Sequence, residues 1–175
     1  MSFAHIALGA NLPSPAGSPA ATLAAAADCL TSLGRIAARS SLYSTTPVGV
    51  IDQPRFLNAV IALETTLTPF ELLGALLLIE RDFGRNRTVI DGPRTLDLDI
   101  LFYDDLVLSE AVLEIPHPRI AERAFVLVPL HEIAPDLRDP RTGKTISQLL
   151  AELSPSRTSL ASSIVPFASA LWTGE

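Results

Sequence analysis

Two aspartates separated by one residue, Asp97 and Asp99, occur in a stretch that is otherwise apolar. Side chains alternate between the two faces of a β-strand, so we expect both carboxylates on one face. The apolar residues around them are expected on the opposite, buried face: Leu96, Leu98, Ile100 and Phe102. Neighbouring carboxylates repel each other unless a cation neutralises them, and a divalent metal that carries a phosphate chain would do so.

Three arginines, Arg85, Arg87 and Arg94, lie in the loop just before these aspartates. The planar guanidinium group is well suited to phosphate oxygens because it donates two parallel hydrogen bonds. Together with the paired carboxylates, these arginines predict a site of phosphoryl transfer from a metal-bound nucleotide. The plainer alternatives are a solvated strand face for the aspartates and solubilising surface charges for the arginines.

Two other patterns do not predict the sites that they resemble. Gly143, Lys144 and Thr145 form the end of a phosphate-binding P-loop, but Arg138 stands where that motif requires a glycine. His117 lies between two prolines with no second histidine or cysteine nearby, so zinc is not indicated.

The composition fits a protein with a hydrophobic core: 48% of the 175 residues are hydrophobic. A net charge of -6 argues against a nucleic-acid-binding surface. The single cysteine, Cys29, excludes an intramolecular disulfide and fits a reducing compartment. It lies in an alanine-rich run, so we expect a packed, inert thiol. We see no signal-like N-terminus and no membrane-spanning run, and we expect a cytoplasmic monomer.

The elements that must position these residues follow the order β-α-β-β-α-β. Hydrophobic periodicity predicts strands at residues 3–8, 36–42, 56–64 and 96–102, and helices at 19–33 and 69–83. This order predicts an α+β, ferredoxin-like fold with an antiparallel sheet. Shorter helices, at 124–132 (interrupted by Pro129) and at 145–153, are expected on the other face, so helices cover both. We expect one domain over residues 1–153, and a C-terminal tail of unassigned role over 154–175.

Residues 92–100, Gly-Pro-Arg-Thr-Leu-Asp-Leu-Asp-Ile, resemble the signature of the 6-hydroxymethyl-7,8-dihydropterin pyrophosphokinase family of folate biosynthesis. Further stretches resemble the same family in the same order: residues 6–12, 43–49, 52–59, 115–119 and 122–127. Members of this family transfer pyrophosphate from ATP to the hydroxymethyl oxygen of the pterin and release AMP. The resemblance implies the same Mg²⁺-dependent reaction for this chain, with ATP as co-substrate.

The resemblance also implies roles for individual residues. Asp97 and Asp99 would hold two Mg²⁺ ions, and Arg85 and Arg94 would contact the phosphates as further catalytic residues. The remaining residues on the ATP side would be Glu80, Ile100, His117 and Arg123. The pterin side would comprise Thr45, Val48, Phe56, Asn58, Asp97 and Phe125.

The sequence departs from the family pattern in the loop before the signature. Some members carry a tryptophan where this chain has Asp91, and the loop over residues 86–91 is slightly shorter, which leaves the role of Arg87 open. The main alternative is another ferredoxin-like, Mg–ATP-dependent small-molecule kinase that releases ADP. A second alternative is a sensing module that binds ATP or pterin without turnover.

Overall fold

The computed structural model describes residues 1–48, 52–86, 92–153 and 164–173. Its main element is a six-stranded sheet with the order β5-β1-β4-β3-β8, in which β2 also pairs with β4. The strands of the sheet are β1 (Ser2–Ala10), β2 (Arg35–Arg39), β3 (Leu42–Thr45), β4 (Phe56–Thr65), β5 (Asp97–Tyr103) and β8 (Val165–Phe167). All pairings in the sheet are antiparallel, and the core order confirms the predicted ferredoxin-like fold.

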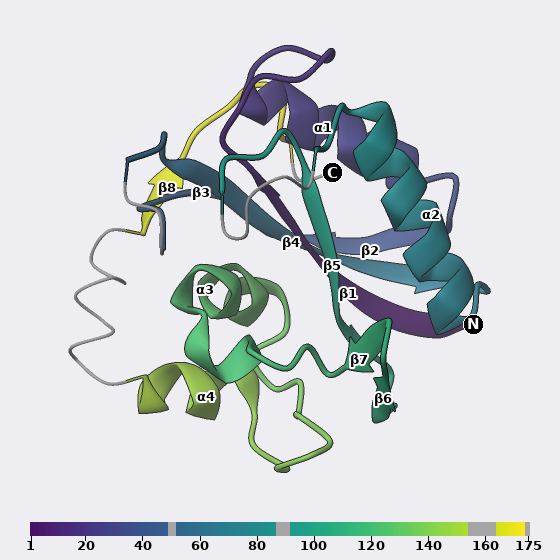
Figure 1. Cartoon of the computed structure of the whole chain (residues 1–175). Coiled ribbons are helices and arrows are strands. Elements are labelled where there is room, and N and C mark those ends of the chain that lie inside the picture. Colours follow the sequence, from purple (N-terminus) through teal and green to yellow (C-terminus); the bar gives the residue numbers. More distant parts are fainter. Residues whose placement is uncertain (49–51, 87–91, 154–163, 174–175) are drawn as a thin grey trace.

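The helices cover both faces of this sheet, as expected (Figure 1). On one face lie α1 (Pro19–Leu30) and α2 (Pro69–Asp82), and on the other lie α3 (Ala124–Ile133) and α4 (Ile146–Glu152). The remaining elements are the small hairpin of β6 (Leu108–Glu110) and β7 (Leu113–Ile115), and a 3₁₀ turn, η1 (Ile120–Glu122). No helix in the described ranges is long and apolar enough to cross a membrane.

Two hydrophobic clusters fill the layers on either side of the sheet. The first lies under α1 and α2 and receives the alternate β4 residues Leu57, Ala59, Ile61 and Leu63. The second lies under α3 and α4 and receives Val60 from the opposite face of β4. This alternation matches the prediction from the sequence and leaves the start of the second face to polar residues such as Asn58.

One expected core position was wrong, because β5 contains a bulge. The pairing of β1 with β5 shifts between His5, opposite Phe102, and Ile6, opposite Ile100. Leu101 is therefore an extra residue in β5, and the alternation of faces changes there. As a result Ile100 packs in the first cluster as expected, whereas Phe102 packs in the second cluster, on the other face of the sheet.

The second predicted strand is also different, since it divides into β2 and β3 at Ser40. The Ser40 backbone N–H donates to Val60 O at 2.9 Å, and the Ser40 hydroxyl accepts from the Val60 N–H at 2.9 Å. A side chain that replaces a main-chain acceptor bends the strand locally. The following strand, β3, then continues to Thr45, beyond the predicted end of the second strand at residue 42.

The helix ends follow the local signals. Ser18 caps α1 and Thr68 forms the predicted capping box with Glu71 at the start of α2. Gly84, with a φ of 77°, follows the end of α2 in the conformation that favours glycine. Helix α3 runs through Pro129 instead of being interrupted by it. Cys29 is exposed on α1, which corrects the expectation of a packed thiol, because it lies on the outer side of the helix.

Candidate active site

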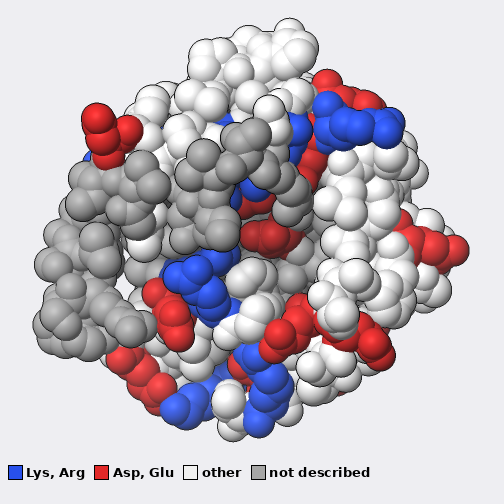
Figure 2. Space-filling model, viewed as in Figure 1, with Lys and Arg blue, Asp and Glu red and all other residues white. Residues whose placement is uncertain are grey.

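A cavity opens on the α3 side of the sheet, where β1, β3, β4 and β5 come together. Figure 2 shows it as a hollow in which blue and red side chains meet. It is lined by these predicted site residues: Thr45, Val48, Phe56, Asn58, Arg94, Asp97, Asp99, Arg123 and Phe125. The structure therefore brings the proposed metal, phosphate and pterin residues into one space, although they come from distant parts of the chain.

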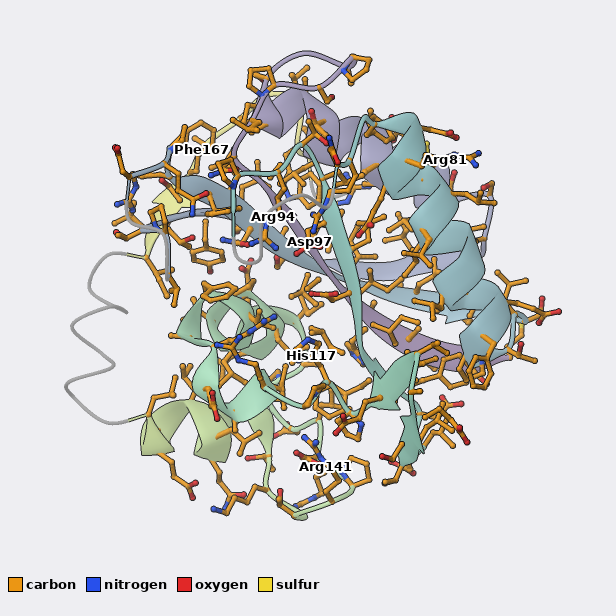
Figure 3. All side chains as sticks on the ribbon, in the orientation of Figure 1. Arg81, Arg94, Asp97, His117, Arg141 and Phe167 are labelled. Atoms are coloured by element: carbon orange, nitrogen blue, oxygen red, sulfur yellow. The ribbon has the colours of Figure 1, made fainter. Side chains whose placement is uncertain are left out.

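Asp97 lies at the centre of this cavity between two arginines. Arg85 Nη1 is 3.0 Å from Asp97 Oδ1, and Arg94 Nη1 donates to Asp97 Oδ2 at 2.6 Å (Figure 3). Arg85 also donates to the backbone oxygen of Leu96 at 2.8 Å. The backbone of Arg94 is fixed by Asn11, whose side-chain oxygen accepts the Arg94 N–H at 2.8 Å. Both guanidinium groups are thus held beside a carboxylate and can exchange it for a phosphate.

Asp99 experiences a different environment from Asp97. The pKa of Asp99 is raised to about 6, first by its removal from water and then by the negative charge of Asp97. Arg123 Nη1, 3.8 Å from Asp99 Oδ2, opposes this effect only in part. A cation bound by the two carboxylates would favour the ionised form of Asp99. Because Mg²⁺ commonly takes one or two carboxylates and completes its shell with phosphate and water, this donor pair fits it.

The described residues contain no group of three or more histidine, cysteine, aspartate or glutamate side chains placed to hold a metal. A tightly caged structural ion such as zinc usually has four protein ligands. The pair formed by Asp97 and Asp99 suits instead an ion that arrives with the phosphates of a nucleotide.

His117 and Arg123 lie side by side next to the cavity, which Arg123 lines. His117 Nδ1 accepts the Arg119 N–H at 3.1 Å, so the neutral ring carries its proton on Nε2. Arg123 Nη1 lies 3.5 Å from that Nε2. The pKa of His117 is lowered to about 4, first by burial and then by the charge of Arg123, so the ring is neutral at pH 7. Two adjacent donors of this kind converge on a shared acceptor such as a phosphate oxygen.

The cavity lining also includes aromatic rings and a side-chain amide. Asn58 is buried, and its side-chain nitrogen donates to the Thr45 hydroxyl at 2.7 Å, which fixes the orientation of the amide. Gly9 makes room for this amide, since a Cβ there would lie 3.0 Å from Asn58 Oδ1. Phe56 and Phe125 provide aromatic faces at the same cavity. Each ring also lies near an arginine, Arg94 at 5.1 Å from Phe56 and Arg123 at 5.8 Å from Phe125.

Four predicted ATP-side residues are not among the residues that line the cavity: Glu80, Arg85, Ile100 and His117. Glu80 is 2% exposed, and its carboxylate accepts the Leu98 N–H at 2.8 Å, which ties α2 to β5. Ile100 packs in the first hydrophobic cluster. Their roles in ATP binding stay predictions. Arg87 and Asp91 lie outside the described residues.

The cavity also contains residues that the sequence analysis did not assign. Arg119 and Glu122 lie at its edge, 3.8 Å apart, and Ile164 reaches it from the C-terminal segment. Arg119 was recognisable, because it follows the proline after His117 in a stretch that resembles the family. Ile164 has no local signal, since only pairing with a strand more than a hundred residues earlier brings it to the cavity.

The rejected P-loop motif proves to be structural. Lys144 Nζ donates to Glu152 Oε2 at 2.7 Å, and Thr145 forms a capping box with Gln148 at the start of α4. Helix α4 has no residue in the cavity lining. The lysine of this motif therefore stabilises a helix instead of contacting a phosphate.

The fold and the cavity define a ferredoxin-like α+β protein with a cavity lined by charged, amide and aromatic side chains. A family model described as 7,8-dihydro-6-hydroxymethylpterin-pyrophosphokinase matches residues 5–135. The chain belongs to this family, which confirms the resemblance seen in the sequence.

The chain is similar to two bacterial proteins named 2-amino-4-hydroxy-6-hydroxymethyldihydropteridine pyrophosphokinase. One, from Pseudomonas aeruginosa, is 46% identical over 149 residues, which cover 84% of this chain and 89% of the relative. The other, from Methylorubrum extorquens, is 46% identical over 158 residues, covering 89% and 96%.

A crystal structure of Plasmodium falciparum HPPK-DHPS wild type with pteroate has a similar fold. It superposes with a TM-score of 0.74 at 15% identity, and the match covers 94% of this chain. The chain spans about half the length of that solved chain, 47%. At this level of identity the likeness establishes the shared fold alone.

Proposed function

We propose that this chain transfers pyrophosphate from ATP to 6-hydroxymethyl-7,8-dihydropterin, giving the pterin diphosphate and AMP in folate biosynthesis. The observation that carries the proposal is that one cavity combines three kinds of group. It is lined by the carboxylates of Asp97 and Asp99, by arginines, and by the Asn58 amide with aromatic rings. Membership of the family and the names of the relatives support the same reaction.

Asp97 and Asp99 are the residues that would hold Mg²⁺, two ions in our proposal. When bound, Mg²⁺ would neutralise the charge of the triphosphate. Arg85 and Arg94 now contact the Asp97 carboxylate at 3.0 and 2.6 Å. When the nucleotide binds, they would release this carboxylate and contact the phosphates instead. The arginines would therefore both bind the nucleotide and free a metal ligand as it enters.

The reaction requires the hydroxymethyl oxygen to attack the β-phosphorus of ATP. A bond forms between that oxygen and phosphorus, the bond from the β-phosphorus to the oxygen of AMP breaks, and the hydroxyl proton is released. Asn58, Phe56 and Phe125 would hold the pterin ring so that its hydroxymethyl group faces the charged side. Arg85 and Arg94 would stabilise charge on the transferred group, while His117 and Arg123 would balance the remaining phosphate.

A single experiment separates this function from its rivals. Purified protein is incubated with Mg–ATP and 6-hydroxymethyl-7,8-dihydropterin, and the nucleotides are separated by chromatography. We expect AMP in a one-to-one ratio with the pterin diphosphate. ADP as the product would indicate instead a simple Mg–ATP-dependent kinase, and an absence of nucleotide consumption would indicate a binding module. Repeating the incubation with EDTA tests the requirement for Mg²⁺.

We further propose that the chain acts as a cytoplasmic monomer and that residues 1–153 form its pyrophosphokinase domain, to which the C-terminal segment adds β8 and Trp172. The exposed, unpaired Cys29 fits a reducing compartment. Light scattering coupled to size exclusion is the test of the monomer, for which the expected mass is 18.7 kDa.

A further inference from the structure

The C-terminal segment over residues 164–173 lies outside the part of the chain that the family model matches. Its strand β8 pairs with β3, with Leu42 opposite Phe167 and Ser44 opposite Val165. The β8 side chains are largely exposed, Val165 at 46% and Phe167 at 42%, so their own burial does not hold the strand in place. The contacts that hold the segment in place lie at its two ends.

Trp172 anchors the far end of the segment. It is only 8% exposed and packs in the first hydrophobic cluster. Its indole N–H donates to the backbone oxygen of Ser40 at 2.8 Å, just before β3 begins. The guanidinium of Arg39 lies 4.7 Å from the centre of the ring and also donates to the backbone oxygen of Thr173 at 3.2 Å. These contacts attach the segment to the start of β3.

Ile164 occupies the other end, where it lines the cavity. The register of the β3–β8 pairing, continued by one residue, places Ile164 opposite Thr45 at the end of β3. Thr45 accepts the hydrogen bond from Asn58 that orients the buried amide. Ile164 also packs against the second hydrophobic cluster, together with Phe125 of α3. It is therefore an apolar neighbour of groups that we assign to pterin binding.

We propose that residues 164–173 position and complete the pterin side of the cavity, with Ile164 as a residue that determines affinity for the planar substrate. This inference rests on the proposed function. Trp172 fixes the segment, β8 holds the end of β3, and Ile164 closes the wall beside Thr45. Ile164 lines the cavity and packs, with Phe125, against the second cluster, so we expect it to affect the pterin and not the triphosphate. The segment thus extends the site beyond the residues shared with the family model.

The size of the effect follows from the apolar surface involved. Truncating a branched aliphatic side chain that contacts a planar ligand typically weakens binding by about one order of magnitude. Ile164→Ala is expected to raise the Kd for the pterin about 5- to 20-fold, and Ile164→Val about 3-fold or less. Trp172→Phe keeps an aromatic ring but removes the indole N–H that bonds to Ser40. It is expected to raise the Kd for the pterin about 2- to 5-fold.

The experiment is an equilibrium titration of 6-hydroxymethyl-7,8-dihydropterin into the full chain and its variants, with and without a non-hydrolysable ATP analogue. Leu171→Ala is the matched control, because Leu171 is 59% exposed in the same segment and does not line the cavity. The KM for ATP and the kcat at saturating pterin are measured in parallel, and both are expected to stay within about 2-fold of wild type in Ile164→Ala. Thermal unfolding identifies any variant that has lost its fold.

The outcomes are distinct. The proposal is supported if the Kd for the pterin is higher in Ile164→Ala, rises less in Ile164→Val and equals the wild-type value in Leu171→Ala. A pterin Kd equal to wild type in folded Ile164→Ala, or an equal rise in the KM for ATP, overturns it. If the wild-type chain did not bind the pterin at all, the proposed function would fail, and this inference with it.

Discussion

The two faces of the central sheet differ in what their side chains do. Under α1 and α2 the sheet presents an almost continuous apolar surface, and the buried carboxylate of Glu80 there accepts a backbone N–H. Under α3 the same strands carry a smaller apolar cluster and then the cavity, where Asp97 and Asp99 repel each other. One face stabilises the fold, which allows the other to hold charges whose arrangement costs stability in the absence of ligands.

Strand β5 contributes side chains to both faces of the sheet, so the difference between the faces can be tested within one strand. Leu98 and Ile100 contribute to the first cluster, while Asp97 and Asp99, which alternate with them, line the cavity. A substitution on one side of this strand should therefore change stability, and one on the other side should change catalysis. The following predictions test that division, from the largest expected effect to the smallest.

Asp99→Asn is expected to lower kcat by about 10³-fold, because it removes one of the two carboxylates that would hold the metal. The free energy of unfolding at pH 7 should stay the same or rise, since burial and the charge of Asp97 both disfavour ionised Asp99. Asp97→Asn should also abolish turnover, but it should reduce stability by leaving Arg85 and Arg94 without their shared partner. Steady-state kinetics at saturating Mg²⁺ and urea unfolding measure both effects. Activity near wild type in either variant would end the metal assignment.

Arg85→Ala and Arg94→Ala are each expected to lower kcat about 10²- to 10³-fold, with a smaller effect on the Kd for the pterin. Guanidinium groups on a phosphate chain act mainly as charge develops in the transition state. Arg138→Ala, whose side chain bonds to the backbone oxygen of Gly143 outside the cavity lining, is the control. A large loss of pterin affinity with an unchanged kcat would show that the two arginines bind the pterin and not the phosphates.

Leu72→Ala should have the opposite profile. Leu72 is fully buried in the first cluster, so its truncation is expected to cost about 2–5 kcal/mol of unfolding free energy. The kcat of the folded fraction should remain within about 2-fold of wild type, because the cavity lies on the other face of the sheet. Urea unfolding monitored by circular dichroism and kinetics below the transition provide the measurements. A kcat loss comparable to that of Asp99→Asn would contradict the division between the faces.

His5 gives the smallest effect, and it depends on pH. Its pKa is lowered from 6.5 to about 4 by burial, where its ring edge meets Phe102. Below pH 6.5 the unfolded chain binds a proton that the folded chain does not, so stability falls until about pH 4 and then levels off. The loss from this one group amounts to about 3 kcal/mol at most.

His5→Leu serves to isolate that contribution. The difference in unfolding free energy between wild type and His5→Leu should grow in favour of the variant from pH 7 to pH 4. Taking the difference removes the contributions of His117 and Asp99, whose pKa values are also shifted. A difference that is independent of pH would show that His5 titrates normally in the folded protein.

Much of the site was predictable because its signals are local. The alternation around Asp97 and Asp99 placed both carboxylates on one face, and the cavity lining confirms it. Cap residues such as Thr68 and Gly84 marked the ends of α2. These features depend on backbone periodicity and on hydrogen bonds between residues a few positions apart, which a sequence states directly.

The remaining features were decided by contacts between distant segments. The bulge at Leu101 arises from the register between β1 and β5, and it moved Phe102 to the second cluster. The division of the second strand depends on Ser40 meeting Val60. Ile164 reaches the cavity through the pairing of β8 with β3. The sequence by itself determined the order of elements and the residues that could take part in catalysis or binding, since those follow from local patterns. Only the tertiary structure decided register and long-range closure, because they are set by which surfaces pack together most favourably.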